Sequence, residues 1–573
     1  MTNQSSPRIH EKISAQKTEK RLRDTFPFQS SANGAPHAPV ARPGVVMSLA
    51  ASIAAPAALA SRASASRRGR ARLASRGVTD ASRRVVGARG PIDRVARAVA
   101  SPSLPSGPLD DLPVPDFLRG PLGDIVRNVE TALPDDAKKA LLRTQYTSAV
   151  GLRLAFFLTQ GVLSSRVSGR SNIDGAAAAA AIAKAVLDPA PRAKIPDEKS
   201  NLGNIVSNAA DGRALTDDEA AEVSQFLEQH LTCIVNLFRT ELEHLENGTY
   251  KFPYDLNPAT APTEQWNPAQ VLAIASDTLS DQAKVSDRRN AKRGQELLDT
   301  FGPDPERYPA YYLQNFHYQT DGWLSADSAR LYDFQVETLF LGSADTMRRQ
   351  ALPFVSRWME GRDPADTKVL DVASGTGRFL TFVRDNWPEL DCTAVELSPH
   401  YLDAVRKSNE RFEDVATYPR AGPLKLVEAN CEKMPFEDAS FDAVTNVYLF
   451  HEMPKEARRN AAREFARVLK PGGKLFFVDS AQVGDGKALG MEKAFDQALE
   501  RFPQFNHEPY YRDYSLTNLE ELFGEFGLVL EESTVAWVSK AWCFTKREDP
   551  SEAVEEVEPV VVEAPDLSGA GAR

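Results

Sequence analysis

The chain has 573 residues, of which 42% are hydrophobic, so its length and composition allow two or three domains with substantial cores. Its formal net charge is -11, which argues against a dedicated nucleic-acid binder because such proteins usually present a basic surface. No apolar run reaches the roughly 18–20 uncharged residues of a membrane span, which leaves peripheral contact as the one form of membrane contact to consider.

Residues 1–108 have the composition of a targeting region followed by a linker. Residues 47–100 are rich in alanine, serine and arginine, contain no lysine and include only two acidic residues, which is typical of an organellar transit peptide. The alternative is a disordered basic arm that binds nucleic acid or anionic lipid. Met47 is a candidate for the true start of the protein, and residues 101–115 are rich in proline, as in a linker.

Residues 109–250 show a helical pattern. The most clearly marked helix begins after Thr216, because Thr216 and Glu219 form a capping box, and Asn247-Gly248 is typical of its end. The other helices expected in this region are Asp135–Val167 and the alanine-rich Ala176–Leu187.

Residues 251–310 are expected to connect two regions, with some helix near Pro268–Leu298, and residues 311–365 are expected to form an aromatic helical cap. Two interpretations of the aromatic residues stay open. They form a lid or substrate wall over the glycine loop described below, or they pack the cap on the next domain. This dense stretch contains Tyr308, Tyr311, Tyr312, Phe316, His317, Tyr318, Trp323, Tyr332 and Phe334.

Residues 366–547 alternate strand and helix signals, which predicts an α/β domain with a mostly parallel sheet. A short turn joins the last two strands, so they are expected to pair antiparallel. A charged helix, Lys455–Leu469, is expected to end at the turn Lys470-Pro-Gly-Gly473, and the acidic tail 548–573 is expected to be disordered. The expected strands are Val369–Val372, Cys392–Val395, Leu424–Glu428, Phe441–Tyr448, Lys474–Asp479, Val529–Val538 and Ala541–Lys546.

The chemistry of this domain centres on residues 369–377. A short apolar strand carrying Asp371 is followed at once by a small-residue loop with Gly375 and Gly377, and apolar residues then resume at helical spacing. Glycines let backbone N–H groups approach a ligand at the start of a helix. Glu396 ends the second strand 19 residues after Gly377, near the offset at which an acid meets ribose hydroxyls in nucleoside-binding α/β folds. A carboxylate suits that task because it accepts two hydrogen bonds from a vicinal diol.

Four motifs follow one another through the domain: Val369-Leu-Asp-Val-Ala-Ser-Gly-Thr-Gly377, Ala394-Val-Glu-Leu-Ser398, Met434-Pro-Phe436 with Ser440-Phe-Asp442, and Val468-Leu-Lys-Pro-Gly-Gly473. In order and spacing they resemble the class I S-adenosylmethionine-dependent methyltransferases, and within them the ubiquinone and menaquinone C-methyltransferases. One such motif is a weak signal, whereas four in register are a strong one. The resemblance implies a Rossmann-like sheet of seven mostly parallel strands with an antiparallel last strand, preceded by an α-helical region.

The aromatic stretch Asn315–Trp323 also resembles uncharacterised plant, algal and cyanobacterial methyltransferase-like proteins. This resemblance favours the chloroplast as the compartment of the protein, with the mitochondrion as the alternative. The transit-like composition does not distinguish the two organelles by itself.

S-adenosylmethionine is the cofactor that the family resemblance implies. Asp371 would reach its ammonium group, Glu396 its ribose hydroxyls, and Asn430 its adenine amino group. Leu397 would pack on the adenine, and Asn446 would close the methionine side. The full set of expected cofactor-binding residues is Asp371, Ala373, Ser374, Gly375, Gly377, Glu396, Leu397, Asn430, Cys431 and Asn446.

Two positions depart from the family pattern. Ala373 stands where the first glycine of the loop is usual, and an alanine is tolerated there if its φ is negative. Asn430 stands where an acid is usual at the adenine, and its side-chain oxygen still accepts a hydrogen bond from an amino group.

The expected reaction is in-line transfer of a sulfonium methyl group to a small, partly apolar acceptor such as a quinone, phenol or isoprenoid, with a protein acceptor as a further alternative. Positioning and desolvation would supply most of the acceleration, and a base would take the proton that the nucleophile loses. The candidate catalytic residues after the fourth strand are Tyr448, His451 and Glu452, and further candidates after the fifth are His507, Tyr510 and Tyr511.

No metal site is expected. The four cysteines match neither a zinc nor a disulfide spacing, which favours a reducing compartment. His451-Glu452 does not begin a zinc-binding helix either, because Lys455 stands where the second histidine would be.

Two other functions compete with methyl transfer. A protein that keeps the fold and serves as a binding or assembly factor is compatible with both departures from the family pattern. An NAD(P)-dependent oxidoreductase is less compatible, because its fingerprint requires a small residue where this chain has Leu380. The acceptor atom and the oligomeric state are not determined by the sequence.

Overall fold

The computed structural model describes residues 134–167, 205, 216–257, 260–261, 267–301, 307–413, 418, 420–548 and 560–561. The expected targeting region, the expected helix Ala176–Leu187 and most of the acidic tail lie outside these residues. Among the described helices, none combines the length and apolar character needed to cross a membrane.

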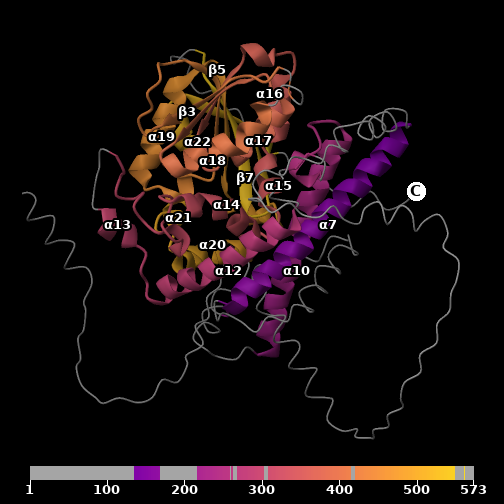
Figure 1. Ribbon diagram of the computed structural model, residues 1–573, viewed down its shortest axis with the longest axis vertical. Helices are drawn as coiled ribbons and strands as arrows, with labels where there is room; N and C mark the ends of the chain where they lie inside the picture. Colours follow the sequence, from indigo (N-terminus) through magenta and orange to yellow (C-terminus); the bar gives the residue numbers. More distant parts are fainter. Residues whose placement is uncertain are drawn as a thin grey trace, which may run out of the picture. The chain divides into compact units, whose positions relative to one another are not determined.

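One eight-stranded sheet forms the centre of the described region, with the strand order β3-β2-β1-β4-β5-β7-β6-β8 (Figure 1). β7 runs antiparallel to both of its neighbours, and the other described pairs are parallel. The predicted seven strands and the antiparallel pairing of the last two are therefore confirmed. The strands are β1 (Lys368–Val372), β2 (Asp391–Glu396), β3 (Leu424–Glu428), β4 (Phe441–Val447), β5 (Leu469–Ser480), β6 (Leu528–Ala536), β7 (Ser539–Lys546) and β8 (Val560–Val561).

Two features of the sheet differ from the sequence prediction. Val560 and Val561, in the tail that was expected to be disordered, pair with the outer edge of β6. Valine favours strands, and an open edge offers unpaired backbone groups. The expected turn at Lys470–Gly473 is instead part of β5, where the register with β4 shifts and Gly472 adopts a φ of 72°. Such an irregularity accommodates the proline and the glycines within the strand.

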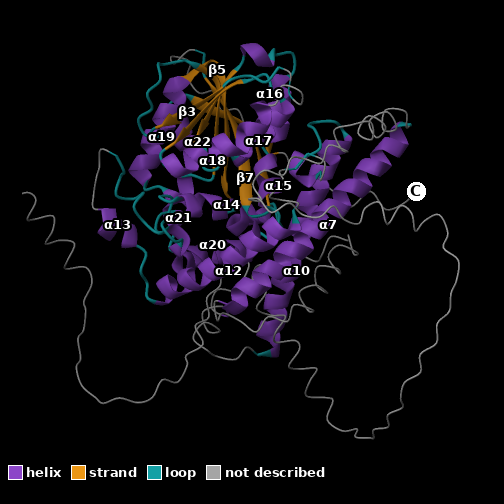
Figure 2. Ribbon diagram, in the orientation of Figure 1, coloured by secondary structure: helices purple, strands orange, loops and turns teal. Residues whose placement is uncertain are grey.

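Helices cover both faces of the sheet (Figure 2). Side chains alternate along each strand, so Phe476 and Val478 of β5 enter one hydrophobic core while Leu475 and Phe477 enter the other. The helices are α7 (Asp135–Val167), α10 (Asp217–Glu246), α12 (Pro268–Asn290), α13 (Glu296–Phe301), α14 (Ala326–Leu339), α15 (Ala344–Arg349), α16 (Leu352–Met359), α17 (Arg378–Asn386), α18 (Pro399–Asn409), α19 (Lys455–Val468), α20 (Glu492–Asn506), α21 (Tyr511–Ser515) and α22 (Leu519–Gly524). The 3-10 turns are η3 (Tyr254–Leu256), η4 (Phe316–Tyr318), η5 (Pro364–Asp366), η6 (Glu410–Glu413), η7 (Phe450–Glu452) and η8 (Asp485–Lys487).

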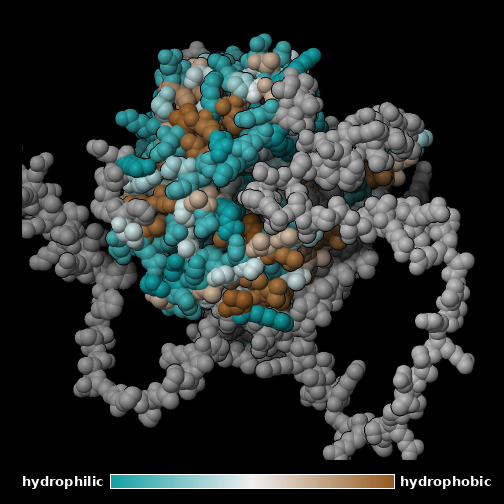
Figure 3. Space-filling view, in the orientation of Figure 1, coloured by the Kyte–Doolittle hydropathy of each residue, from teal (hydrophilic) through white to brown (hydrophobic). Residues whose placement is uncertain are grey.

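The N-terminal helices share a core with the sheet. The long helix Asp135–Val167 and the capping box of Thr216 with Glu219 are both confirmed. Tyr146 of α7 and Ile234 of α10 are buried in the same hydrophobic core as one face of the sheet. The α7 and α10 side chains thus stabilise the α/β domain directly. On the coloured part of the face shown in Figure 3, hydrophilic residues surround smaller hydrophobic areas.

A buried ionic cluster joins the N-terminal helices to the start of α17. Arg349 of α15 lies 2.5 Å from Glu241 of α10 and 3.4 Å from Asp255 of η3. Arg378, the first residue of α17, lies 3.1 Å from Asp255 and 2.6 Å from Asp345. Because buried charges are stable only when paired, this cluster fixes α10, η3 and α15 against the residue that follows the glycine loop.

Candidate functional site

The glycine loop lies between β1 and α17 and is held by its own backbone. The N–H of Ser374 donates to the carbonyl of Val395 at 3.0 Å, and the N–H of Gly377 donates to the carbonyl of Ser374 at 2.8 Å. Gly375 and Gly377 have φ values of 56° and 75°, which glycine adopts without strain. No atom lies within 4 Å of the place where a Cβ on Gly375 would stand, so its backbone faces open space.

The expectation that Ala373 has a negative φ is wrong. Its φ is 52°, in the left-handed region, where a Cβ crowds the backbone at a cost of roughly 1–2 kcal/mol. The loop therefore keeps the backbone path that glycine would favour, and the surrounding hydrogen bonds hold the alanine in it.

Two buried carboxylates stand beside the loop at the ends of β1 and β2. Asp371 accepts a hydrogen bond from the Thr445 hydroxyl at 2.6 Å, and Glu396 accepts from the N–H groups of Gly375 and Ser398, both at 2.9 Å. Burial raises the pKa of Asp371 to about 6 and that of Glu396 to about 7, although these hydrogen bonds oppose the shift. Both groups thus titrate closer to neutral pH than ordinary carboxylates.

These residues line a cavity of about 120 Å³, which we call the loop cavity. Tyr311, Tyr312, Trp323 and Tyr332 form part of its wall, so part of the aromatic stretch lies beside the glycine loop. Its role as a lid or substrate wall stays a prediction. The cap also packs through α14 against α18 and α12, which confirms the second interpretation. The expected cofactor-binding residues that line this cavity are Asp371, Ala373, Ser374, Gly375, Glu396, Leu397, Asn430 and Cys431.

Gly377 and Asn446, also expected to bind the cofactor, do not line the loop cavity. A Cβ on Gly377 would lie 3.0 Å from a methyl group of Val405, so this glycine allows close packing against α18. The Asn446 side chain is fully buried and donates to the Val372 carbonyl at 2.8 Å, which ties β4 to β1. Asn430 lines the cavity, but its oxygen accepts from the Glu432 N–H at 2.9 Å. The roles assigned to these residues stay predictions.

The loop cavity contains two arginines that the sequence analysis did not single out. Arg378 and Arg348 line it, and Asp345 pairs with both, at 2.6 and 2.8 Å. Their positive charges are already partly neutralised by this carboxylate. The position of Arg378 directly after Gly377 was the one sequence signal that would have identified it.

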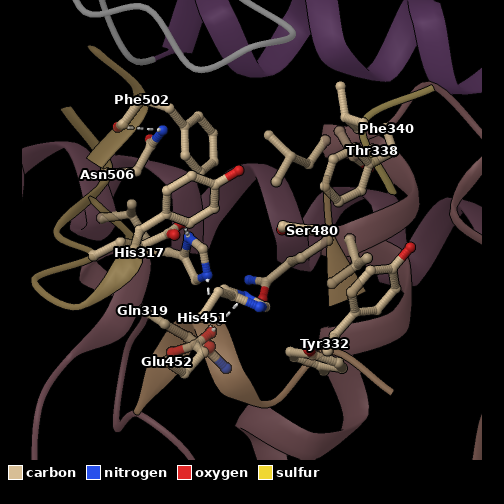
Figure 4. A pocket seen from close by; sticks show the side chains of 18 of the residues that line it. His317, Gln319, Tyr332, Thr338, Phe340, His451, Glu452, Ser480, Phe502 and Asn506 are labelled. Carbon is tan, nitrogen blue, oxygen red and sulfur yellow. Dashed lines mark hydrogen bonds and ion pairs between the residues drawn. The ribbon is translucent and has the colours of Figure 1, made fainter. Parts of the chain in front are cut away.

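A second cavity of about 210 Å³ adjoins the loop cavity, and we call it the apolar cavity. Tyr332, Tyr448 and Glu452 line both cavities and therefore mark the junction between them. The view in Figure 4 places His451 and Glu452 toward one end and Phe340 and Phe502 toward the violet helix at the other. The apolar side chains of this cavity are Val285, Val336, Leu339, Phe340, Met347, Leu499, Phe502 and Val538.

The three candidate catalytic residues differ in what they are able to do. Tyr448 donates its hydroxyl to Ser539 at 3.0 Å, and burial raises its pKa, so it stays protonated at neutral pH. His451 lies 2.6 Å from Asp479 through Nδ1. Burial acts to lower the pKa of His451, but the charge and hydrogen bond of Asp479 outweigh burial and raise it to about 9. His451 is therefore mainly cationic at neutral pH and is a poor base.

Glu452 is the candidate base at the junction of the cavities. Its Oε1 lies 3.3 Å from His317 Nε2 and 3.6 Å from His451 Nε2. Its Oε2 is buried and has no hydrogen-bond partner within the described part of the chain. His317, Asp479 and Glu508, which lies 3.1 Å from His317, were missed as functional residues. Only two weak signals pointed to them: His317 falls inside the aromatic motif, and Asp479 ends the fifth expected strand.

The candidates after the fifth strand do not share one position. Tyr511 lines the apolar cavity. His507 contacts the Gly294 carbonyl at 3.1 Å, and the Tyr510 hydroxyl accepts from Gln314 at 2.9 Å, and neither residue lines a described cavity. Among the described residues, no group of three histidine, cysteine or acidic side chains is arranged to hold a metal ion.

Comparison with known proteins gives consistent matches to methyltransferases. Residues 370–477 match a family described as a methyltransferase domain. A ubiquinone/menaquinone biosynthesis C-methyltransferase of Rhizobium etli is 30% identical over 190 residues, which are 32% of this chain and 68% of that protein. A protein of the same description from Geobacter sulfurreducens is 34% identical over 27% of this chain and 55% of its own length.

A demethylmenaquinone methyltransferase of Chlorobaculum tepidum is 34% identical over 26% of this chain and 55% of that protein. This chain thus spans about half the length of several curated relatives that it matches. Among solved structures, a methyltransferase dependent on S-adenosylmethionine from Aquifex aeolicus is 13% identical and covers 39% of this chain and 99% of that chain, with a TM-score of 0.28.

Proposed function

Because the chain belongs to the class I S-adenosylmethionine-dependent methyltransferases, in the branch of the ubiquinone/menaquinone C-methyltransferases, we propose that it methylates a small acceptor with a polar head and an apolar tail. The observation that carries this proposal is the pair of adjoining cavities that share Tyr332, Tyr448 and Glu452. One cavity contains the glycine loop, and the other combines ionisable groups at the junction with an apolar remainder.

The loop cavity fits S-adenosylmethionine, the cofactor of this family. The open space beside Gly375 allows a ligand to approach the backbone, and two buried carboxylates line the cavity. Glu396 would bind the ribose hydroxyls, and Asp371 would bind the ammonium group. When bound, the cofactor supplies an electrophilic methyl group on a positively charged sulfur.

The residues around the junction would position the acceptor and take up its proton. Glu452 offers a buried oxygen without a partner in the described region, and the acceptor's polar head would satisfy it. Tyr332 and Tyr448 would orient the head, while the apolar walls exclude water from the reacting atoms. Proton transfer to a positioned side chain contributes typically 10²–10⁴-fold to such reactions.

The far end of the apolar cavity favours an apolar tail. Gly161 of α7 lines this cavity, and a Cβ at this position would meet only ordinary contacts, the nearest being Leu341 at 3.7 Å. A small residue there leaves room that a larger side chain would fill. Quinol, phenol and isoprenoid acceptors have the required combination of a polar head and an apolar tail.

The proposal is tested with the full chain, labelled S-adenosylmethionine and three probes. These are decylhydroquinone, unsubstituted hydroquinone and the dimethyl ether of decylhydroquinone, which has no acidic hydroxyl. We expect label in decylhydroquinone, less in hydroquinone and none in the ether. In the variant Gly161→Phe, KM should rise for decylhydroquinone and stay unchanged for hydroquinone.

If none of the three probes is methylated, titration calorimetry with S-adenosylmethionine distinguishes the remaining explanations. Cofactor binding without transfer to any probe or to an organellar extract would support the alternative of a binding or assembly factor. Absence of cofactor binding would contradict the proposal as a whole.

For the compartment, we propose the plastid, with the mitochondrion as the alternative. The arginine-rich, lysine-free composition of residues 47–100 supports targeting to an organelle. The resemblance of Asn315–Trp323 to plant, algal and cyanobacterial methyltransferase-like proteins favours the plastid. A fluorescent protein fused after residue 133 should enter plastids, and a fusion that lacks residues 1–108 should not.

A further inference from the structure

Five ionisable side chains form a series at the apolar cavity, of which His317, His451, Glu452 and Glu508 line the cavity and Asp479 lies behind His451. Asp479 lies 2.6 Å from His451, and His451 lies 3.6 Å from Glu452. Glu452 in turn lies 3.3 Å from His317, whose other ring nitrogen lies 3.1 Å from Glu508. Figure 4 shows His317 and His451 converging on Glu452. The order carboxylate, imidazole, carboxylate, imidazole, carboxylate allows protons to move between neighbours.

Two of these carboxylates have unused hydrogen-bonding capacity inside the protein. Glu508 is 1% exposed and Glu452 is 7% exposed. Within the described residues, Oε2 of Glu452 and both side-chain oxygens of Glu508 have no hydrogen-bond partner. The contact of Glu508 with His317 is an ion-pair distance without hydrogen-bond geometry. A buried polar oxygen without a partner costs roughly 1–3 kcal/mol, so such atoms point to a ligand or a proton that the protein is built to accept.

The two imidazoles next to Glu452 differ in how firmly they are held. Asp479 is fully buried and also accepts from the N–H groups of Phe450 and Ser480, both at 2.7 Å. His451 is thereby fixed beside a carboxyl group that the backbone holds in place. Glu508 makes no comparable backbone contact in the described region and faces His317 alone at close range. The His317 arm is thus the one free to change its protonation.

We propose that Glu452, His317 and Glu508 form a proton relay that removes the hydroxyl proton of a phenol- or quinol-type acceptor during methylation. This inference rests on the proposed function. In one turnover the acceptor's O–H bond breaks and its proton goes to Oε2 of Glu452. The acceptor's electron pair forms the bond to the methyl carbon, and the pair of the broken carbon–sulfur bond stays on sulfur.

His317 then carries the proton onward. Its Nε2 receives a proton from Glu452 while its Nδ1 gives one to Glu508, so one proton moves from Glu452 to Glu508, and the ring ends in the opposite tautomer with its own charge unchanged. The charges are suited to this direction. Burial raises the pKa of Glu508 to about 7 despite the opposing effect of His317 and His451. Glu508 therefore holds a proton near neutral pH more readily than an ordinary carboxylate.

Other titratable groups surround the relay, and each has an assigned partner or state. Around Glu508 these are Asp479, which His451 neutralises, and Tyr511, whose pKa burial raises so that it stays neutral. Near His317, burial lowers the pKa of His507. Arg289 of α12 also lines the cavity, and its guanidinium lies over the Tyr318 ring.

The relay favours a neutral acceptor over a cationic one. His451 carries a positive charge beside Glu452, and burial does not prevent this because Asp479 stabilises the imidazolium. A cationic acceptor would bring a further positive charge next to the positively charged sulfur of the bound cofactor. An acceptor with an acidic hydroxyl instead enters the site neutral, gives its proton to the relay and leaves as the methylated product.

The experiment uses the full chain and the variants Glu508→Gln and His317→Gln, with Glu492→Gln as the matched control. Glu492 is an exposed carboxylate at the start of α20, outside both cavities. The probe is decylhydroquinone, and kcat and KM are measured against pH. We expect both relay variants to lose about 100-fold in kcat near neutral pH and to change the pH profile, with KM and cofactor affinity within about twofold of the parent. The control should match the parent protein.

Two outcomes would overturn the relay. One is a Glu508→Gln profile that superimposes on that of the parent, and the other is transfer to decylamine in preference to decylhydroquinone. Failure of the parent protein to bind S-adenosylmethionine in calorimetry would instead refute the proposed function.

If decylhydroquinone is bound but not methylated, nuclear magnetic resonance of labelled histidines decides the question. Glu508→Gln should lower the pKa of His317 by more than that of His451, because His317 is the imidazole in contact with Glu508. An unchanged His317 titration would also overturn the relay.

Discussion

The affinity for the cofactor should depend on the ionisation of Glu396. Its pKa is raised by burial to about 7, and only the ionised form accepts hydrogen bonds from both hydroxyls of a ribose diol. At pH 6 about one tenth of the molecules carry the ionised form, compared with about nine tenths at pH 8. The dissociation constant of S-adenosylhomocysteine should therefore be about tenfold larger at pH 6, a difference of about 1.4 kcal/mol.

Titration calorimetry at pH 6, 7 and 8 measures this dependence directly. Glu396→Gln is the matched variant, because glutamine keeps the shape and one accepting oxygen but does not ionise. Its affinity should be weak and nearly independent of pH. Since any titration of the ligand affects both proteins equally, the difference between them reports Glu396. Asp371, with a pKa of about 6, adds up to about a twofold effect in the same direction, and Asp371→Asn measures it. A flat profile for the parent protein, or an equal slope in Glu396→Gln, would refute the assigned ribose contact.

Three further perturbations test other parts of the structure. Ala373→Gly removes a Cβ from a residue with a φ of 52°, so the midpoint of urea unfolding should rise, by up to about 1 kcal/mol in stability, and a lower midpoint would contradict the strain. The raised pKa of His451 stabilises the fold, and this contribution of about 3 kcal/mol is fully present below pH 6.5. It should be lost as the pH rises through about 9. In His451→Gln, that part of the pH dependence of the free energy of unfolding should be absent. Asp345→Asn removes the carboxylate that pairs with Arg348 and one of the two that pair with Arg378, so it should lower the free energy of unfolding by about 3–5 kcal/mol. The exposed control Asp403→Asn should change it by less than about 0.5 kcal/mol.

Local patterns were sufficient to predict most of the elements. The helix Asp135–Val167, the capping box at Thr216 and the strand Leu424–Glu428 agree with the structure at both the type and the position of the element. These features depend on residues that are close together in the sequence, namely apolar periodicity and capping groups. The fold class also followed, because alternating strands and helices have few stable arrangements.

The backbone conformation at single positions was harder to predict from the sequence. Nothing in the local sequence indicates that Ala373 adopts a positive φ, because the surrounding loop and β2 impose it. Pairing of Val560 and Val561 with β6 requires an open strand edge, which only the assembled sheet provides.

The sequence by itself determined the glycine loop, the acid at the end of the second strand and, through four motifs in order, the family and its cofactor. These are determined locally because one βα turn and its neighbouring strand ends form that half of the site. The acceptor half was decided only by the tertiary structure. His317 lies 135 residues before Glu452 in the chain, yet η4 and η7 bring their side chains to 3.3 Å. Helices α7, α12, α14 and α20 then enclose the apolar cavity around them. Such contacts arise from packing between elements that are distant in the chain, so they cannot be inferred from the spacing of residues in the sequence.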